Sequence, residues 1–168
     1  MTEDKSSDSK GVCRMRDILF KAKTYNGEWV QGLLAHKDNK WYISNKEGMP
    51  FAFEVRPETI GQYTGLTDKN GNKIWENDIV ELYDTNNNYK WKAIVKFGNP
   101  NATYNWGYQL YPIGQYKVNT DILLWVEMED TGTICEVIGN VFDNPELLNY
   151  VDNDASQQAH QEVLKLAT

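Results

Sequence analysis

The chain has 168 residues, of which 40% are apolar and 12% aromatic, and its formal net charge is −7 at pH 7. This composition excludes a wholly disordered chain, and the length favours one domain with a sizeable core. No run of about 18 apolar residues occurs and the amino terminus lacks the apolar centre of a secretory signal, so we expect a cytoplasmic protein without a membrane span.

The amino-terminal third predicts a succession of short strands. Residues 1–14 are rich in Ser, Asp and Lys and have little to bury, so we expect a flexible arm. Residues 16–23 and 28–35 alternate between apolar and polar side chains around Asn26-Gly27, which predicts a β-hairpin. Further strands are predicted at 40–44 and 51–55, and Arg56-Pro57 ends the second because proline cannot donate to a ladder. "PETI" at 57–60 is compatible with one helical turn.

Residues 59–82, "TIGQYTGLTDKNGNKIWENDIVEL", have the oxygen-rich spacing of a calcium loop. Counted from Asp68, however, positions 6 and 12 are a lysine and an isoleucine, where an EF-hand loop needs glycine and glutamate. We therefore reject calcium. Asn70-Gly71 tolerates positive φ and favours a tight turn between antiparallel strands, so the stretch predicts strand, turn and strand.

The rest of the chain predicts more strands and a terminal helix. "WKAIVKF" at 91–97 alternates over its whole length, and "YQLYPI" at 108–113 is typical of an edge strand ended by Pro112. "DILLWVEM" at 121–128 and "TICEVIGNVF" at 133–142 are predicted as the last two strands. Helical turns are expected near Pro145 and after Asp154.

Together these elements predict an all-β domain over residues 15–149, a small barrel or strongly bent sheet of roughly eight strands, followed by a helical tail over 150–168. An α+β sandwich is the alternative.

No pattern of catalytic residues is recognisable. The two histidines, His36 and His160, lie in no motif, and the two cysteines, Cys13 and Cys135, form no CxxC pair. Neither standard phosphate-binding glycine loop occurs. We therefore expect a protein without enzymatic activity, cofactor or metal.

Charge is distributed unevenly along the chain. Residues 118–164 contain ten acidic side chains and no lysine or arginine. These acidic residues either form a solvated face that keeps the protein soluble or form a surface that binds a basic partner. Nucleic acid is not the expected partner, because the net charge repels phosphate, although Lys90, Lys92 and Lys96 form a local basic strip. The proposed acidic partner surface comprises Asp121, Glu127, Glu129, Asp130, Asp143 and Glu146.

Three stretches resemble the YopX-like family of bacteriophage and prophage proteins: "MRDILFKAKTYNGEWVQG" at 15–32, "PETIGQYTGLTDKNGNKIWENDIVEL" at 57–82 and "CEVIGNVFDNPELL" at 135–148. The resemblance implies a mostly β domain of phage origin that acts in the bacterial host cell, with no established enzymatic activity or cofactor. It supplies no catalytic residues.

The long central motif is interpreted as structural. Its glycines suit turns or close contacts, its rings suit a core, and Asp78 is placed to accept a hydrogen bond from a turn backbone. The residues assigned to these roles are Gly61, Tyr63, Gly65, Asn70, Gly71, Trp75 and Asp78.

Two functions are therefore carried forward. The first is a non-enzymatic accessory protein that binds a host or phage protein, or a second copy of itself through exposed rings or sheet edges. The second is an acidic mimic of nucleic acid that occupies a basic groove on a host defence or regulatory protein.

Overall fold

The computed structural model describes residues 17–44, 51–85, 88–99, 106–114, 121–126 and 133–149. These residues form ten strands in two antiparallel sheets, together with three helices of three or four residues each. The mainly β class predicted from the sequence is confirmed. The predicted arm at 1–14 and the predicted tail at 150–168 lie outside the described residues.

The first sheet has the strand order β4-β3-β2-β1-β5-β6. It is strongly bent, because β2 pairs with β1 up to Gly32 and with β3 from Leu33 onward. An isolated bridge between Thr24 and Val55 brings the end of β4 back to the end of β1. The strands are β1 (Phe20–Lys23), β2 (Trp29–Lys37), β3 (Lys40–Ser44), β4 (Ala52–Val55), β5 (Gly61–Thr67) and β6 (Lys73–Trp75).

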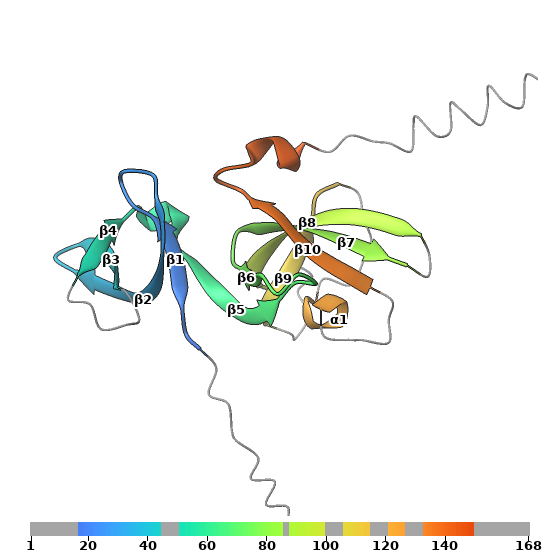
Figure 1. Ribbon diagram of the computed structural model, residues 1–168, viewed down its shortest axis with the longest axis horizontal. Coiled ribbons are helices and arrows are strands. Elements are labelled where there is room, and N and C mark those ends of the chain that lie inside the picture. The colour runs from blue at the N-terminus through green and yellow to red at the C-terminus, as the bar shows by residue number, and fades with distance from the viewer. Residues whose placement is uncertain are drawn as a thin grey trace, which may run out of the picture.

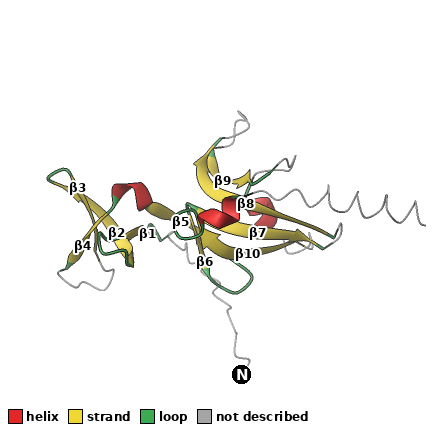
Figure 2. Cartoon of the chain, turned by 90° about the horizontal axis from the view of Figure 1, so that it is seen from above, coloured by secondary structure: helices red, strands yellow, loops and turns green. Residues whose placement is uncertain are grey.

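The second sheet has the order β10-β7-β8-β9 and lies beside the bent part of the first sheet in both views, with β5 running from one to the other (Figures 1 and 2). The predicted edge strand at 108–113 is confirmed, because β9 ends the sheet. The strands are β7 (Asp78–Asp84), β8 (Tyr89–Gly98), β9 (Gly107–Pro112) and β10 (Thr133–Asn140).

The predicted strand at 121–128 is wrong, because residues Leu123–Val126 form the helix α1. The carboxylate of Asp121 accepts the N–H of Leu123 at 3.0 Å and so favours a turn. Ile122, Trp125 and Val126 then lie at helical spacing and pack on the core. The Trp125 ring is edge-on to that of Trp91, with ring centroids 5.1 Å apart. The short apolar run fits either periodicity, and tertiary packing selects the helix.

The described residues form three apolar clusters. In the first, Ala22, Ile43 and Val55 are buried inside the bend of the first sheet. The second and largest cluster spans both sheets, because Leu66 of β5 and Ile74 of β6 pack with Trp91, Leu82 and further residues of β7 to β10. A small third cluster of Leu19, Tyr63 and Trp75 lies where the two sheets meet. Apolar packing therefore joins the two sheets, and the polar contacts of the cleft described below add to it.

The hairpin predicted in the central motif is confirmed for β5 and β6, and Gly71 has the positive φ of +81° that the turn requires. The second strand is shorter than the pattern suggests. It stops at Trp75, and Asn77, with φ of +71°, reverses the chain so that β7 begins at Asp78 in the other sheet. The motif thus builds the passage from one sheet to the other.

Two predicted helical turns are also present. Pro57–Thr59 forms the 3-10 helix η1 between β4 and β5, and Pro145–Leu148 forms the 3-10 helix η3 after β10. In both, proline occupies the start of the helix, where its missing N–H costs nothing.

Candidate binding sites between and beside the sheets

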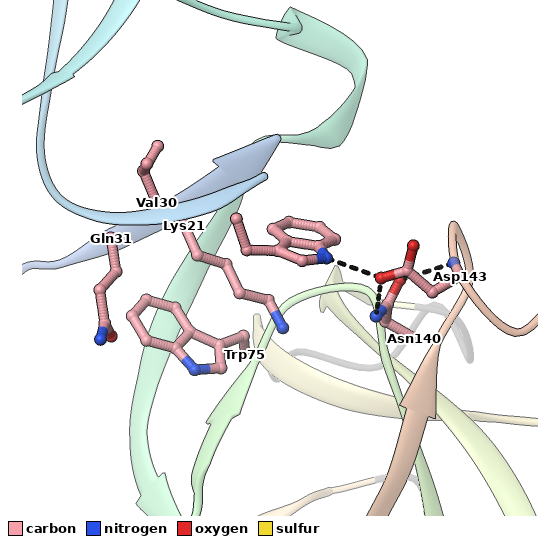
Figure 3. A pocket seen from close by; sticks show the side chains of 7 residues that line it. Lys21, Val30, Gln31, Trp75, Asn140 and Asp143 are labelled. Carbon is pink, nitrogen blue, oxygen red and sulfur yellow. Dashed lines mark hydrogen bonds between the residues drawn. The ribbon is translucent and has the colours of Figure 1, made fainter. Parts of the chain in front are cut away.

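A cleft of about 340 Å³ opens between the first sheet and the end of β10 (Figure 3). Its first-sheet wall comes from β1, β2 and β6, and the end of β10 with the turn that follows supplies the rest. Because side chains alternate along a strand, Lys21 and Lys23 project from the same face of β1. The lining residues are Lys21, Trp29, Val30, Gln31, Trp75, Asn140 and Asp143.

The inner end of the cleft is defined here by the ion pair between Lys21, which lines the cleft, and Asp78 behind it. The Asp78 side chain is 2% exposed. One of its oxygens pairs with the Lys21 ammonium, and the other accepts the backbone N–H of Trp75 at 2.8 Å. The expected turn-backbone acceptor is therefore present. Burial raises the pKa of the Asp78 carboxyl, while Lys21 and the Trp75 N–H act in the opposite direction.

The same lysine contacts two indole rings. The Lys21 Nζ lies 5.1 Å from the ring centroid of Trp29 and 5.7 Å from that of Trp75. Both distances allow cation–π attraction, so the ammonium is stabilised by aromatic faces as well as by Asp78.

Asp143 lines the outer end of the cleft. Its Oδ1 pairs with the Lys23 ammonium, and its Oδ2 accepts the Trp29 indole N–H at 2.6 Å and the Asn140 amide at 3.0 Å. Lys23 and then Asn140 are the main causes that lower the pKa of the Asp143 carboxyl to about 2. The carboxylate therefore stays ionised at neutral pH and ties β1 and β2 to the end of β10.

The turn that carries Asp143 is stabilised by its own hydrogen bonds. The Asn140 Oδ1 accepts the N–H groups of Phe142 and Asp143, both at 3.0 Å. The Asn144 N–H donates to the Asn140 carbonyl at 3.0 Å. A Cβ at Gly139 would come within 2.4 Å of the Asn144 amide oxygen, so a side chain there would force that amide to move. This turn presents Asp143 to the first sheet.

Asp68 has a structural role that the sequence analysis missed. Its buried carboxylate accepts the N–H groups of Asn70 at 2.9 Å and of Asn72 at 2.8 Å, and the Asn72 side-chain amide at 3.1 Å. It also accepts the Val137 N–H at 3.1 Å, across to β10. Burial acts to raise the pKa of Asp68, but these hydrogen bonds together outweigh it and lower the pKa. The aspartate two residues before Asn70-Gly71 was a signal of such a local turn.

The residues assigned to structural roles fall in two places. Gly61, Tyr63, Trp75 and Asp78 lie at the junction of the sheets: a side chain at Gly61 would come within 2.5 Å of the Glu76 carbonyl oxygen, and the Tyr63 and Trp75 rings are 5.3 Å apart. Gly65, at φ +91°, lies where the β5–β6 register shifts. Asn70 and Gly71 form the hairpin turn, where the Asn70 amide donates to Glu136 at 3.3 Å.

The acidic surface is only partly described. Glu127, Glu129 and Asp130 lie outside the described residues. Asp121 precedes α1. Asp143 lies just before η3, and Glu146 lies within it. The helices α1 and η3 flank opposite ends of β10 (Figure 1). Asp143 is engaged with Lys23. A single acidic surface stays a prediction.

A second, apolar groove of about 290 Å³ lies between β9 and α1. Leu66 and Ile122 line it as buried residues, whereas Trp106, Phe97 and Leu123 are 73%, 56% and 47% exposed. Sequence reasoning did not single out this groove, because its residues come from four separate stretches. Among the described lining residues the charged one is Asp121, which also belongs to the predicted acidic surface.

Within the described part of the chain, no group of three or more His, Cys, Asp or Glu side chains is placed to hold a metal ion. Across the same residues, every helix is too short to cross a bilayer.

The fold and the cleft define a two-sheet, mainly β protein whose sheets are joined by one continuous motif, residues 57–82. The model of the YopX protein family matches residues 6–149, and the chain belongs to this family. No curated protein matches the chain. The crystal structure of protein EF1440 from Enterococcus faecalis is similar at 22% identity and a TM-score of 0.43, over 80% of this chain and 100% of that one.

Proposed function

We propose that this YopX family member is a phage- or prophage-encoded accessory protein that binds another protein and has no enzymatic activity. The observation that carries the proposal is the apolar groove between β9 and α1, with its largely exposed indole of Trp106. Exposed tryptophan beside a preformed apolar pocket is typical of the anchoring centre of a protein interface.

The groove is suited to one apolar side chain of a partner. Phe97 and Tyr108, which face each other across β8 and β9, have ring centroids 5.4 Å apart in an edge-on arrangement. They and Trp106 surround a floor of Leu66 and Ile122. An aliphatic or aromatic anchor inserted there would contact these rings and the two buried aliphatic side chains.

The charge at the rim favours a basic residue next to that anchor. Asp121 is the charged member of the described lining, and the whole chain carries a net charge of −7. A partner with lysine or arginine beside its apolar anchor would therefore be attracted over distance and oriented at the groove.

The described side chains support a non-enzymatic role. Burial is the first cause that raises the pKa of the Cys135 thiol to about 12, so its thiolate is negligible at neutral pH. The His36 ring lies tilted against the Trp41 ring, with centroids 4.5 Å apart. This pair is in the bent sheet rather than at either candidate site.

The test is comparative capture of proteins from a bacterial host lysate by immobilised full-length chain. Trp106→Ala and Leu123→Ala should each lose the same captured protein, whereas Leu33→Ala should keep it. Leu33 is a matched control because it is also an aliphatic residue, 52% exposed, on another element. A captured protein that survives both groove variants would contradict the proposal.

Light scattering of the purified chain addresses the self-association alternative. A monomer is expected for the parent protein. A dimer that Trp106→Ala dissociates would assign the groove to a second copy of the chain instead.

A further inference from the structure

Three side-chain donors from three strands converge on one carboxylate at the mouth of the cleft. They are the Lys23 ammonium from β1, the Trp29 indole N–H from β2 and the Asn140 amide from β10. The accepting group, Asp143, is 120 residues from Lys23 and 114 from Trp29 along the chain. Both carboxylate oxygens therefore accept hydrogen bonds from side-chain donors, one of them charged.

The donors on the first sheet are held by contacts of their own. Two ammonium groups lie near the indole of Trp29, with the Lys21 Nζ 5.1 Å and the Lys23 Nζ 5.5 Å from its ring centroid. Phe142 packs against the same indole with centroids 6.1 Å apart. Lys21 is already paired with Asp78, so the positive charge that faces the mouth is that of Lys23.

The charge and shape of this donor set indicate its ligand. One ammonium and two neutral N–H donors match a planar group with one negative charge and two acceptor oxygens. A single lysine would not balance the two negative charges of a dianionic phosphate. The occupant in the structure is an aspartate on a short peptide turn, so the site accommodates a carboxylate presented by a peptide.

We propose that Lys23, Trp29 and Asn140 form a binding site for the carboxylate of an acidic peptide side chain, which Asp143 of the same chain fills. A competing acidic segment would replace Asp143 and release the turn after β10 from the first sheet. This site is separate from the apolar groove, so the inference does not depend on the function proposed for that groove.

The test follows the Trp29 indole N–H by two-dimensional proton–nitrogen NMR of the full chain, with the resonance assigned from Trp29→Phe. In Asp143→Ala, sodium acetate should shift this resonance saturably in the millimolar range, whereas sodium chloride at equal ionic strength should not. Glu146→Ala is the matched control, because it removes a neighbouring acid and leaves Asp143 in place; there acetate should have no saturable effect.

Two further arms separate the sources of the carboxylate. N-acetyl-aspartate N-methylamide should bind to Asp143→Ala more tightly than acetate does. Equal or weaker binding would overturn the peptide part of the proposal. Adding Lys23→Met to Asp143→Ala should abolish both responses.

The site itself would be refuted if acetate gave no saturable shift in Asp143→Ala, or if the shift persisted without Lys23. Should Asp143→Ala fail to fold, Asp143→Asn keeps the shape of the turn and leaves an uncharged occupant. Acetate should then displace the introduced amide at higher concentration, and the absence of a saturable shift would count equally against the proposal.

Discussion

The inner and outer ends of the cleft use the same chemistry in different surroundings. At each end a lysine of β1 pairs with an aspartate from the far side, Lys21 with Asp78 and Lys23 with Asp143. The Asp78 side chain is 2% exposed and that of Asp143 is 35% exposed. Their pKa values move in opposite directions: burial raises that of Asp78, and Lys23 with its neighbouring donors lowers that of Asp143 to about 2.

The difference shows that the surroundings, rather than the ion pair, decide what each carboxylate does. Removing Asp78 from water costs free energy that Lys21 only partly offsets, so the inner pair adds little net stability, although removing one partner would leave the other charge buried and unpaired. Asp143 keeps contact with water and gains three donors, so the outer pair is favourable to form and still accessible to competitors.

The largest expected effect is at the inner end. Asp78→Ala should lower the free energy of unfolding by about 3 kcal/mol, because it leaves the Lys21 ammonium without its anion and the Trp75 N–H without its acceptor in a buried place. Urea denaturation measures the loss. Asp78→Asn, which retains an acceptor oxygen, should cost less; an equal cost would show that charge alone matters at this end.

A third carboxylate sharpens the comparison because it is buried and held mainly by backbone N–H groups. Asp68→Ala should lower the free energy of unfolding by about 2 kcal/mol, since the N–H groups of the hairpin turn and of β10 lose their acceptor. Hydrogen exchange should speed up at Val137 together with the turn. Unchanged exchange at Val137 would contradict the link between this turn and β10.

The outer end should contribute less to stability. Asp143→Asn keeps the shape of the side chain but removes its attraction to Lys23. The free energy of unfolding should fall by about 1 kcal/mol, because solvent screening at this partly exposed pair reduces the roughly 2 kcal/mol that the lowered pKa alone corresponds to. Urea denaturation beside Asp78→Ala provides the comparison. A loss for Asp143→Asn larger than that for Asp78→Ala would reverse the assignment of the two ends.

The contribution of Asp143 to the free energy of unfolding should also depend on pH, and the lowered pKa fixes the direction. The pKa of Asp143 is about 2 in the folded protein, against its ordinary value of 3.8. A lowered carboxyl pKa stabilises the fold above the ordinary value, and that stabilisation is lost as the pH falls from about 4 to about 2. The stability difference between the parent chain and Asp143→Asn should therefore shrink over this window. A difference that stays constant would contradict the lowered pKa.

Much of the first sheet was predictable from local pattern. Alternation identified its strands, and Asn26-Gly27 and Asn70-Gly71 marked its turns. Asp78 was recognised as a backbone acceptor because its donor, Trp75, is only three residues away. In contrast, the run that forms α1 was misassigned, because an isolated run of apolar residues fits a strand as well as a buried helical turn.

The cleft could not be predicted for a physical reason. Lys21 and Asp78 are 57 residues apart, and Lys23 and Asp143 are 120 apart. No local spacing connects such residues, and their meeting depends on how the two sheets join. The acidic residue 143 was therefore grouped with its sequence neighbours as a free surface charge, whereas the structure pairs it with Lys23.

The most direct test of the contrast between the two ends is carbon-13 NMR titration of the side-chain carboxyl groups of Asp78 and Asp143 in the parent chain. We expect Asp143 to titrate at about pH 2 and Asp78 above the ordinary value of 3.8. Titration of both groups together near the ordinary value would contradict the account, because burial would then not distinguish the two ion pairs.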